Sequence, residues 1–106
     1  MSAEELKNVV VDALDEVKGV DIRVLDVREK SSFADLMVIA TGTSDRHVKA
    51  LAGKVQEKCR EAGERPIGVE GEREGQWVLI DLADVVVHVM TAQTRDFYNL
   101  EKLWGA

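Results

Sequence analysis

The polar loop Thr41–His47, with the sequence TGTSDRH, is the segment of this chain that most suggests a site for chemistry. A turn of small residues before a helix can hold a phosphate group, because free backbone N–H groups point at the anion. Nucleotidyl transfer would also need two carboxylates that point at one pair of metal ions. Asp81 and Asp84 are three residues apart and would face opposite sides of a strand, and the strand after the second helix offers only Glu70. An N-cap and a tight turn explain the loop without a ligand, so we favour the structural interpretation.

Histidine and cysteine are scarce, with His47 and His88 the only histidines and Cys59 the only cysteine. Their spacing matches no closed metal site. Cys59 falls on an apolar helical stripe, where a buried thiol is inert, so a Cys–His nucleophile is disfavoured. We therefore predict no metal site, no cofactor and no enzymatic activity.

Composition bounds the class of protein. A length of 106 residues fits one domain, residues 1–106, and the 45% of hydrophobic residues suffice for a core without metal or disulfide support. The net charge of −6, from 20 acidic and 14 basic residues, disfavours direct nucleic-acid binding and suits a basic protein partner. The acidic N-terminus MSAEELKNVV is unlike a signal peptide, and the apolar runs are too short to span a membrane. These features predict a soluble cytoplasmic protein.

Apolar residues at helical spacing predict three helices. The first spans Ser2–Lys18, with Ser2 as its N-cap, and the second spans Asp45–Ala62, with Ser44 as its N-cap. The third covers residues 91–104, with its start near Thr94. The apolar stripe of the second helix contains Val48, Leu51, Ala52, Val55 and Cys59.

Five strands are predicted between and after these helices. The alternating segment Val20–Val27 would place Val20, Ile22 and Val24 on one face, and the apolar run Ala34–Thr41 is typical of a buried strand. Three more strands follow at residues 66–70, 76–82 and 85–90. The order α-β-β-α-β-β-β-α predicts a single α+β (mixed α/β) domain, in which helices pack against a mixed five-stranded sheet.

The last two strands form a hairpin if Ala83 and Asp84 are a two-residue turn. One face of the hairpin is then aliphatic and predicted to be core, with Val78, Ile80, Leu82, Val85, Val87 and Val89. The other face, which we call the Trp77 face, carries Trp77, Leu79, Asp81, Val86, His88 and Met90. A slip of one residue would exchange the two faces, so this division depends on the register.

Two interpretations of the Trp77 face stay open. Its mixture of residue types suits a half-exposed recognition surface, but a helix could equally cover it and make Trp77 a core residue. The terminal segment raises the same question, because Tyr98 and Glu101 are predicted to be exposed, and a Trp–Tyr pair beside acids is a suitable anchor for a partner. The residues predicted to pack inward from that segment are Phe97, Leu100 and Trp104.

A combination of motifs covers nearly the whole chain: ATGTS-x-RHV, GVEG, W-x-L-x-D-L-x-D-V-V-V-H-V-M and LEKLW. Together with the stretch DIRVLDVREKSSFADLMVI, it resembles the ribosomal silencing factors, the Iojap-related family. Members of that family usually have glycine where this chain has Ala83, and glycine tolerates the positive φ of a primed turn.

The resemblance implies a topology like that of nucleotidyltransferases, but without their catalytic carboxylates. It also implies binding to the large ribosomal subunit through the fourteenth large-subunit protein, which blocks joining with the small subunit and represses translation when nutrients are short. An acidic protein could reach the ribosome through a basic protein without adhering to rRNA. The docking residues implied by the strand face and the family together are Trp77, Asp81, Leu82, Asp84, Val86, His88, Met90 and Tyr98, with Glu70 at the rim.

Two alternatives accompany this hypothesis. The loop TGTS before a helix also fits a nucleotide-binding or nucleotidyltransferase-like enzyme. The Trp77 face could instead pair two copies of the chain, and both a monomer and a homodimer are compatible with ribosome binding.

Overall fold

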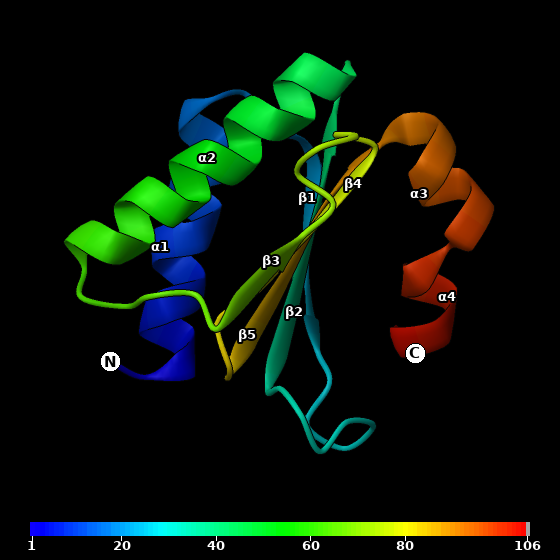
Figure 1. The fold of residues 1–106 in the computed structure, drawn as a ribbon. Coiled ribbons are helices and arrows are strands. Elements are labelled where there is room, and N and C mark those ends of the chain that lie inside the picture. Colours follow the sequence, from blue (N-terminus) through cyan, green and yellow to red (C-terminus); the bar gives the residue numbers. More distant parts are fainter. Residues whose placement is uncertain (106) are drawn as a thin grey trace.

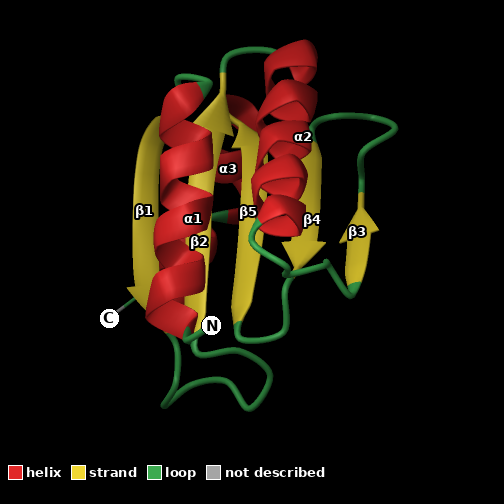
Figure 2. Ribbon diagram, turned by 90° about the vertical axis from the view of Figure 1, so that its left-hand side faces the viewer, coloured by secondary structure: helices red, strands yellow, loops and turns green. Residues whose placement is uncertain are grey.

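A mixed five-stranded sheet lies between two layers of helices in this computed structural model, which describes residues 1–105 (Figure 1). Helices α1 (Ala3–Glu16) and α2 (Asp45–Glu61) cover one face of the sheet and lie side by side across it (Figure 2). The short helices α3 (Ala92–Tyr98) and α4 (Leu100–Trp104) lie on the opposite face. In this part of the chain, no helix has the length and apolar run needed to cross a membrane.

The strands are β1 (Val20–Asp26), β2 (Leu36–Gly42), β3 (Gly68–Glu70), β4 (Trp77–Asp81) and β5 (Val85–Thr91). They follow the order β1-β2-β5-β4-β3 across the sheet. The central pair β2–β5 is parallel, whereas β1–β2, β4–β5 and β3–β4 are antiparallel. This arrangement confirms the predicted mixed sheet and the predicted order of elements, except at the last helix.

The main core lies between the sheet and the α1–α2 layer. The predicted apolar stripe of α2 is fully buried there, and every residue of β2 is buried because helices cover both faces of that strand. The predicted caps are also confirmed. The Ser2 side chain accepts from the Glu5 backbone N–H while Glu5 accepts from the Ser2 N–H, and the Ser44 Oγ accepts from the His47 N–H at 3.0 Å.

The first strand departs from the predicted alternation. Asp21 has a φ of 49°, and the pairing between β1 and β2 shifts between Val20 and Arg23, so one extra residue enters β1. Val20 therefore pairs with Thr41 on the α3–α4 face, whereas Ile22 packs into the main core on the other face. The prediction that these two residues share a face is wrong, because it assumed strict alternation along the strand and a bulge interrupts that alternation.

The predicted terminal helix is divided into α3 and α4 at Asn99, which has a φ of 47°. The N-cap is Thr91, three residues before the predicted start at Thr94. The break rotates the two halves, so Phe97 is 76% exposed and its predicted inward packing is wrong. Leu100 and Trp104 do pack inward, against a smaller cluster that contains Val27, Ala34, Met37, Ile39 and Met90.

Candidate docking surface

The hairpin register has the predicted form. Trp77 pairs with Met90 and Asp81 with Val86, and the backbone N–H of Leu82 donates to the Val85 carbonyl at 3.0 Å to close the two-residue turn. The six residues of the predicted aliphatic face are all buried in the main core. The division of the hairpin into an aliphatic face and the Trp77 face is thus confirmed.

The Trp77 face is covered only in part. Met90 is fully buried in the small cluster beneath α3 and α4, whereas Trp77, Leu79 and Val86 are only partly buried. The structure therefore shows that helices cover part of the face, while its role in recognition stays a prediction. Met90 and His88 are buried, whereas Trp77, Leu79, Asp81 and Val86 keep partial contact with solvent.

Four rings form a continuous aromatic ladder along the edge of this face. The centroid of Trp77 lies 5.8 Å from that of His88 and 4.7 Å from that of Tyr98, and Phe97 lies 5.0 Å beyond Tyr98. The rings are tilted or T-shaped, which are favourable geometries for aromatic pairs. Trp77 comes from β4 and Tyr98 from α3, so the ladder fixes the helix against the sheet.

His88 is held in one tautomer. The Trp77 Nε1–H donates to His88 Nδ1 at 2.9 Å, so Nδ1 accepts and the neutral ring carries its hydrogen on Nε2. Burial lowers the pKa of His88 from 6.5 to about 4. Protonation of Nδ1 would also remove the acceptor for Trp77. His88 is therefore a neutral packing residue that orients the Trp77 indole.

The nine predicted docking residues fall into three groups by exposure. Glu70, Asp84 and Tyr98 are exposed, and Trp77, Asp81 and Val86 are partly buried. Leu82, His88 and Met90 are buried, with 5%, 6% and 0% of their surface exposed. These last three offer no contact surface in this structure, because Leu82 points into the main core and Met90 lies under the terminal helices. We therefore restrict the docking surface to the first six residues.

The acids of the candidate surface have different local roles. The Asp81 Oδ1 accepts from the Ala83 backbone N–H at 2.9 Å and shapes the turn, in which Ala83 has a φ of 69°. Glu70 lies on the edge strand β3, opposite Leu79 of β4. Together with Asp84 they place negative charge around the apolar centre of the docking surface.

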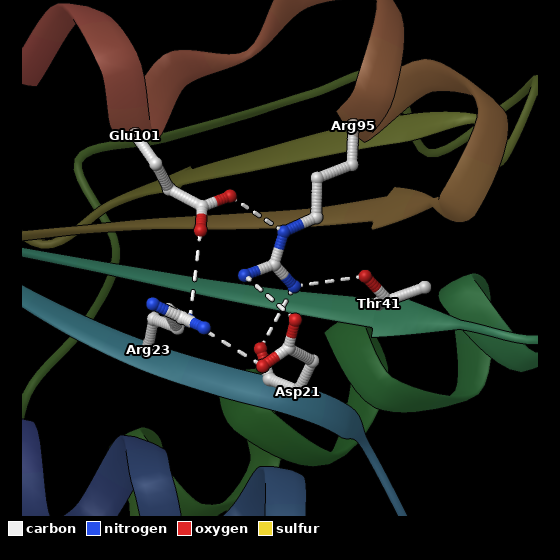
Figure 3. Close-up of polar contacts among 5 residues, drawn as sticks. All are labelled: Asp21, Arg23, Thr41, Arg95 and Glu101. Carbon is white, nitrogen blue, oxygen red and sulfur yellow. Dashed lines mark hydrogen bonds and ion pairs between the residues drawn. The ribbon is translucent and has the colours of Figure 1, made fainter.

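A buried arginine that the sequence did not reveal holds the terminal helices to the sheet (Figure 3). Arg95 of α3 is 7% exposed, and its Nη1 donates to the Thr41 Oγ1 and to the Asp21 carbonyl, each at 2.8 Å. Its Nε donates to Glu101 of α4 at 2.7 Å, and Arg23 of β1 lies 3.7 Å from the same carboxylate. One guanidinium thus joins β1, β2, α3 and α4.

The charges in this cluster balance, but one buried donor lacks a hydrogen bond. The Arg95 Nη2 is buried without a hydrogen-bond partner, since the Asp21 carboxylate lies 3.8 Å away. The hydrogen bond from Arg95 lowers the pKa of Glu101. Glu101 is partly buried by this pairing, so its predicted exposure is wrong. No sequence pattern identified the cluster, because Asp21 reaches Arg95 only through the bulge in β1.

The loop TGTSDRH uses its polar groups within the protein. The Thr43 N–H donates to His47 Nδ1 at 2.9 Å, and His47 Nε2 lies 2.7 Å from the Val17 carbonyl, so the loop is tied to the end of α1. A Cβ at Gly42 would lie 2.7 Å from the Val48 side chain, which explains the glycine by the close approach of α2. These contacts support the structural interpretation of the loop.

The single cysteine is buried, and burial raises the pKa of the Cys59 thiol to about 11. A thiol in this state is a poor nucleophile at neutral pH. Within residues 1–105, no three His, Cys, Asp or Glu side chains are placed to hold a metal ion.

Comparison with known protein families gives a match over the whole chain. Residues 1–106 match a family described as "Ribosomal silencing factor during starvation". The ribosomal silencing factor RsfS of Chromobacterium violaceum is 48% identical over 99% of this chain and 86% of its own length. The same-named protein of Bacillus subtilis is 40% identical over 99% of this chain and 89% of its own length. The maize protein Iojap, chloroplastic, is 36% identical over 88% of this chain and 40% of its own length.

Solved structures agree with these matches. A crystal structure of a Chromobacterium violaceum protein is 47% identical and superimposes with a TM-score of 0.98 over 100% of this chain and 88% of that one. A Bacillus halodurans crystal structure, 39% identical, gives a TM-score of 0.87 over 95% of this chain and 94% of that one.

Proposed function

Because the chain belongs to the ribosomal silencing factor family, we propose that it binds the large ribosomal subunit through the fourteenth large-subunit protein and prevents the small subunit from joining. The result is repression of translation when nutrients are short. The role is regulatory, as the names of its relatives indicate, and needs no catalytic group. The whole chain acts as one domain, in the cytoplasm.

The partly exposed Trp77 carries this proposal. A large aromatic ring that is held by His88 and Tyr98 loses little further conformational freedom when a partner covers it. Trp77 and Val86 provide an apolar centre, and Asp81 and Asp84 provide negative charge beside it. This arrangement of an apolar centre with a charged rim is typical of protein–protein interfaces.

Charge favours a basic partner. The net charge of −6 attracts positively charged protein surfaces and repels phosphate backbones, so it favours a ribosomal protein over bare rRNA. Silencing then follows from occupancy alone. A bound protein on the joining face occupies the volume that the small subunit needs, and its effect should rise with the fraction of large subunits that carry it.

Subunit joining in vitro tests the proposal. Purified large and small subunits are mixed at increasing concentrations of this protein, and joined ribosomes are measured in a sucrose gradient. We expect the joined peak to fall as the protein sediments with the large subunit. Unchanged joining while the protein saturates the large subunit would rule out the steric mechanism.

Variants of residues that reach solvent test which part of the protein binds the large subunit. Trp77→Ala should weaken binding to the large subunit by about 2 kcal/mol or more, and Tyr98→Ala should weaken it to a smaller extent. Leu103→Ala is a matched control, because Leu103 is 68% exposed on α4 and lies outside the docking surface. Circular dichroism of each variant separates loss of binding from loss of fold. Equal binding by the Trp77 and Leu103 variants would contradict the assigned surface.

A further inference from the structure

A cavity of about 460 Å³ lies beside the docking surface, between the start of α2, the start of β4 and α3. Nothing in the interpretation of the hairpin accounts for it. Its lining combines hydroxyl and amide groups with two aromatic rings and one carboxylate. The lining residues that matter for its chemistry are Asp45, Gln76, Gln93, Thr94, Phe97 and Tyr98.

Asp45 is the one charged residue that lines the cavity, and it is exposed. Among residues 1–105, no lysine or arginine lines the same space, so a cationic group that enters would meet one acid there. The two amide side chains, from Gln76 and Gln93, offer carbonyl oxygens as further acceptors.

The aromatic residues of the cavity are the most exposed part of the ladder. Phe97 is 76% exposed and Tyr98 is 52% exposed, and their rings meet at 73°. Phe97 therefore adds little to the stability of the fold, although it is large and apolar. An exposed ring and a carboxylate that line one cavity can provide a cation–π partner and an ion-pair partner for the same group.

We propose that this cavity receives an arginine side chain of the partner protein, which pairs with Asp45 and stacks on the ring of Phe97, beside Tyr98. The proposal rests on the proposed function only for the source of the arginine. A guanidinium fits better than a lysine ammonium, since it is planar, is weakly hydrated, stacks on rings and donates five N–H groups in a fork. The acceptors in the cavity can take several of these donors at once.

The alternative of an anionic ligand is disfavoured by the same contacts. The Asp45 carboxylate would repel a phosphate or carboxylate, and the Thr43 and His47 N–H groups of the adjacent loop already donate within the protein. The cavity is also continuous with the docking surface, because Tyr98 contacts Trp77 and Gln76 precedes it in sequence. A partner seated on Trp77 would therefore place neighbouring side chains at the cavity.

Titration with a blocked peptide tests the site without the ribosome. The tripeptide acetyl-Gly-Arg-Gly-amide is added at millimolar concentration to the 15N-labelled protein, and NMR shifts are followed. We expect saturable shifts at Thr43, Asp45, Gln76, Gln93 and Phe97. The same peptide with citrulline, glutamate or lysine in place of arginine should shift these residues less, as should inorganic phosphate. Stronger shifts with phosphate or glutamate than with arginine would overturn the proposal.

Two substitutions remove the two halves of the site. Asp45→Asn and Phe97→Leu should each raise the dissociation constant for the arginine peptide by about twofold to fivefold. Asp12→Asn serves as the control, because Asp12 is an acid on α1 that reaches solvent and does not line this cavity. Thermal melts verify that each variant is folded. Unchanged affinity of a folded Asp45→Asn protein would overturn the proposal.

The ribosome assay separates this proposal from the proposed function. Large subunits should bind Asp45→Asn and Phe97→Leu about twofold to fivefold more weakly than wild type, with a shallower dependence on salt for Asp45→Asn. If wild type fails to bind subunits but still binds the arginine peptide selectively, the proposed function fails and the site stands. If subunits bind and the peptide is not selected, the site fails alone.

Discussion

The indole N–H of Trp77 donates to Nδ1 of His88 across the β4–β5 pair, at a distance of 2.9 Å. The two residues are diagonal neighbours, because Trp77 pairs with Met90 and His88 pairs with Leu79. The bond links the most prominent residue of the docking surface to a buried and neutral imidazole. The orientation of Trp77 therefore depends on the protonation state of His88.

The free energy of unfolding should decrease as the pH is lowered through the window set by His88. Its pKa is about 4 in the folded protein against 6.5 ordinarily, so between these values the unfolded chain binds more protons. The free energy of unfolding should therefore drop by about 2 kcal/mol from pH 6.5 to 4.5. Urea titrations at several pH values measure it. His88→Asn, which retains an acceptor near the Nδ1 position, should lose most of this slope, and an equal slope in that variant would contradict the assignment.

Arg95 should be essential for the packing of the terminal helices. Arg95→Lys cannot satisfy Thr41, the Asp21 carbonyl and Glu101 in the same geometry, and should cost about 2–3 kcal/mol. Hydrogen exchange should accelerate most in residues 92–104. The exposed Arg73→Lys is the control and should change neither quantity. Uniform loss of protection across the whole domain would mean that α3 and α4 do not open separately.

Ala83 occupies a backbone conformation that favours glycine. Its φ of 69° strains an L-residue with a Cβ, so Ala83→Gly should stabilise the protein by about 1 kcal/mol and raise its melting temperature. Ala62→Gly provides the contrast, because Ala62 has a φ of −83° and gains nothing from glycine there. Calorimetric melts of both variants measure the difference, and a destabilised Ala83→Gly protein would refute the strain.

Two glycines should respond to alanine with opposite signs. Gly42→Ala would push a methyl group into the Val48 side chain at 2.7 Å and its backbone nitrogen at 2.8 Å, and should cost about 1–3 kcal/mol. Gly53 lies on α2, and a Cβ added there would meet no atom within 4 Å. Gly53→Ala should therefore stabilise the protein by about 1 kcal/mol, because alanine favours the helix more than glycine does. Chemical denaturation of the two variants gives both values. A tolerated Gly42→Ala would show that α2 can shift away from β2.

Local patterns predicted the features that local physics determines. The cap at Ser44, the apolar stripe of α2 and the hairpin register around Ala83 each depend on residues a few positions apart, and each has the predicted form. The Trp77 face was also identified from the alternation of β4 and β5. Its exposure could not be predicted, because coverage depends on where α3 and α4 pack.

The features that escaped prediction are set by contacts between distant segments. Arg95 meets Asp21 across 74 positions of sequence, and that contact accompanies the bulge that moves Val20 to the other face. The pairing of Arg95 with Glu101 is local, but it depends on the break at Asn99, which the continuous helical spacing of the segment does not reveal. A motif of Cys, His or Gly residues can be recognised in a sequence and would have predicted such a cluster. A single arginine within a polar helix carries no such signal.

The parallel pairing of β2 with β5 determines when this domain can assemble. Residue 36 pairs with residue 85 and residue 42 with residue 91, so the two central strands are separated by nearly half of the chain. Nearly all of the chain must be synthesised before the middle of the sheet exists, because β2 has only β1 beside it until then. During its own translation, each new copy therefore cannot form the Trp77 face until its last strand has been made.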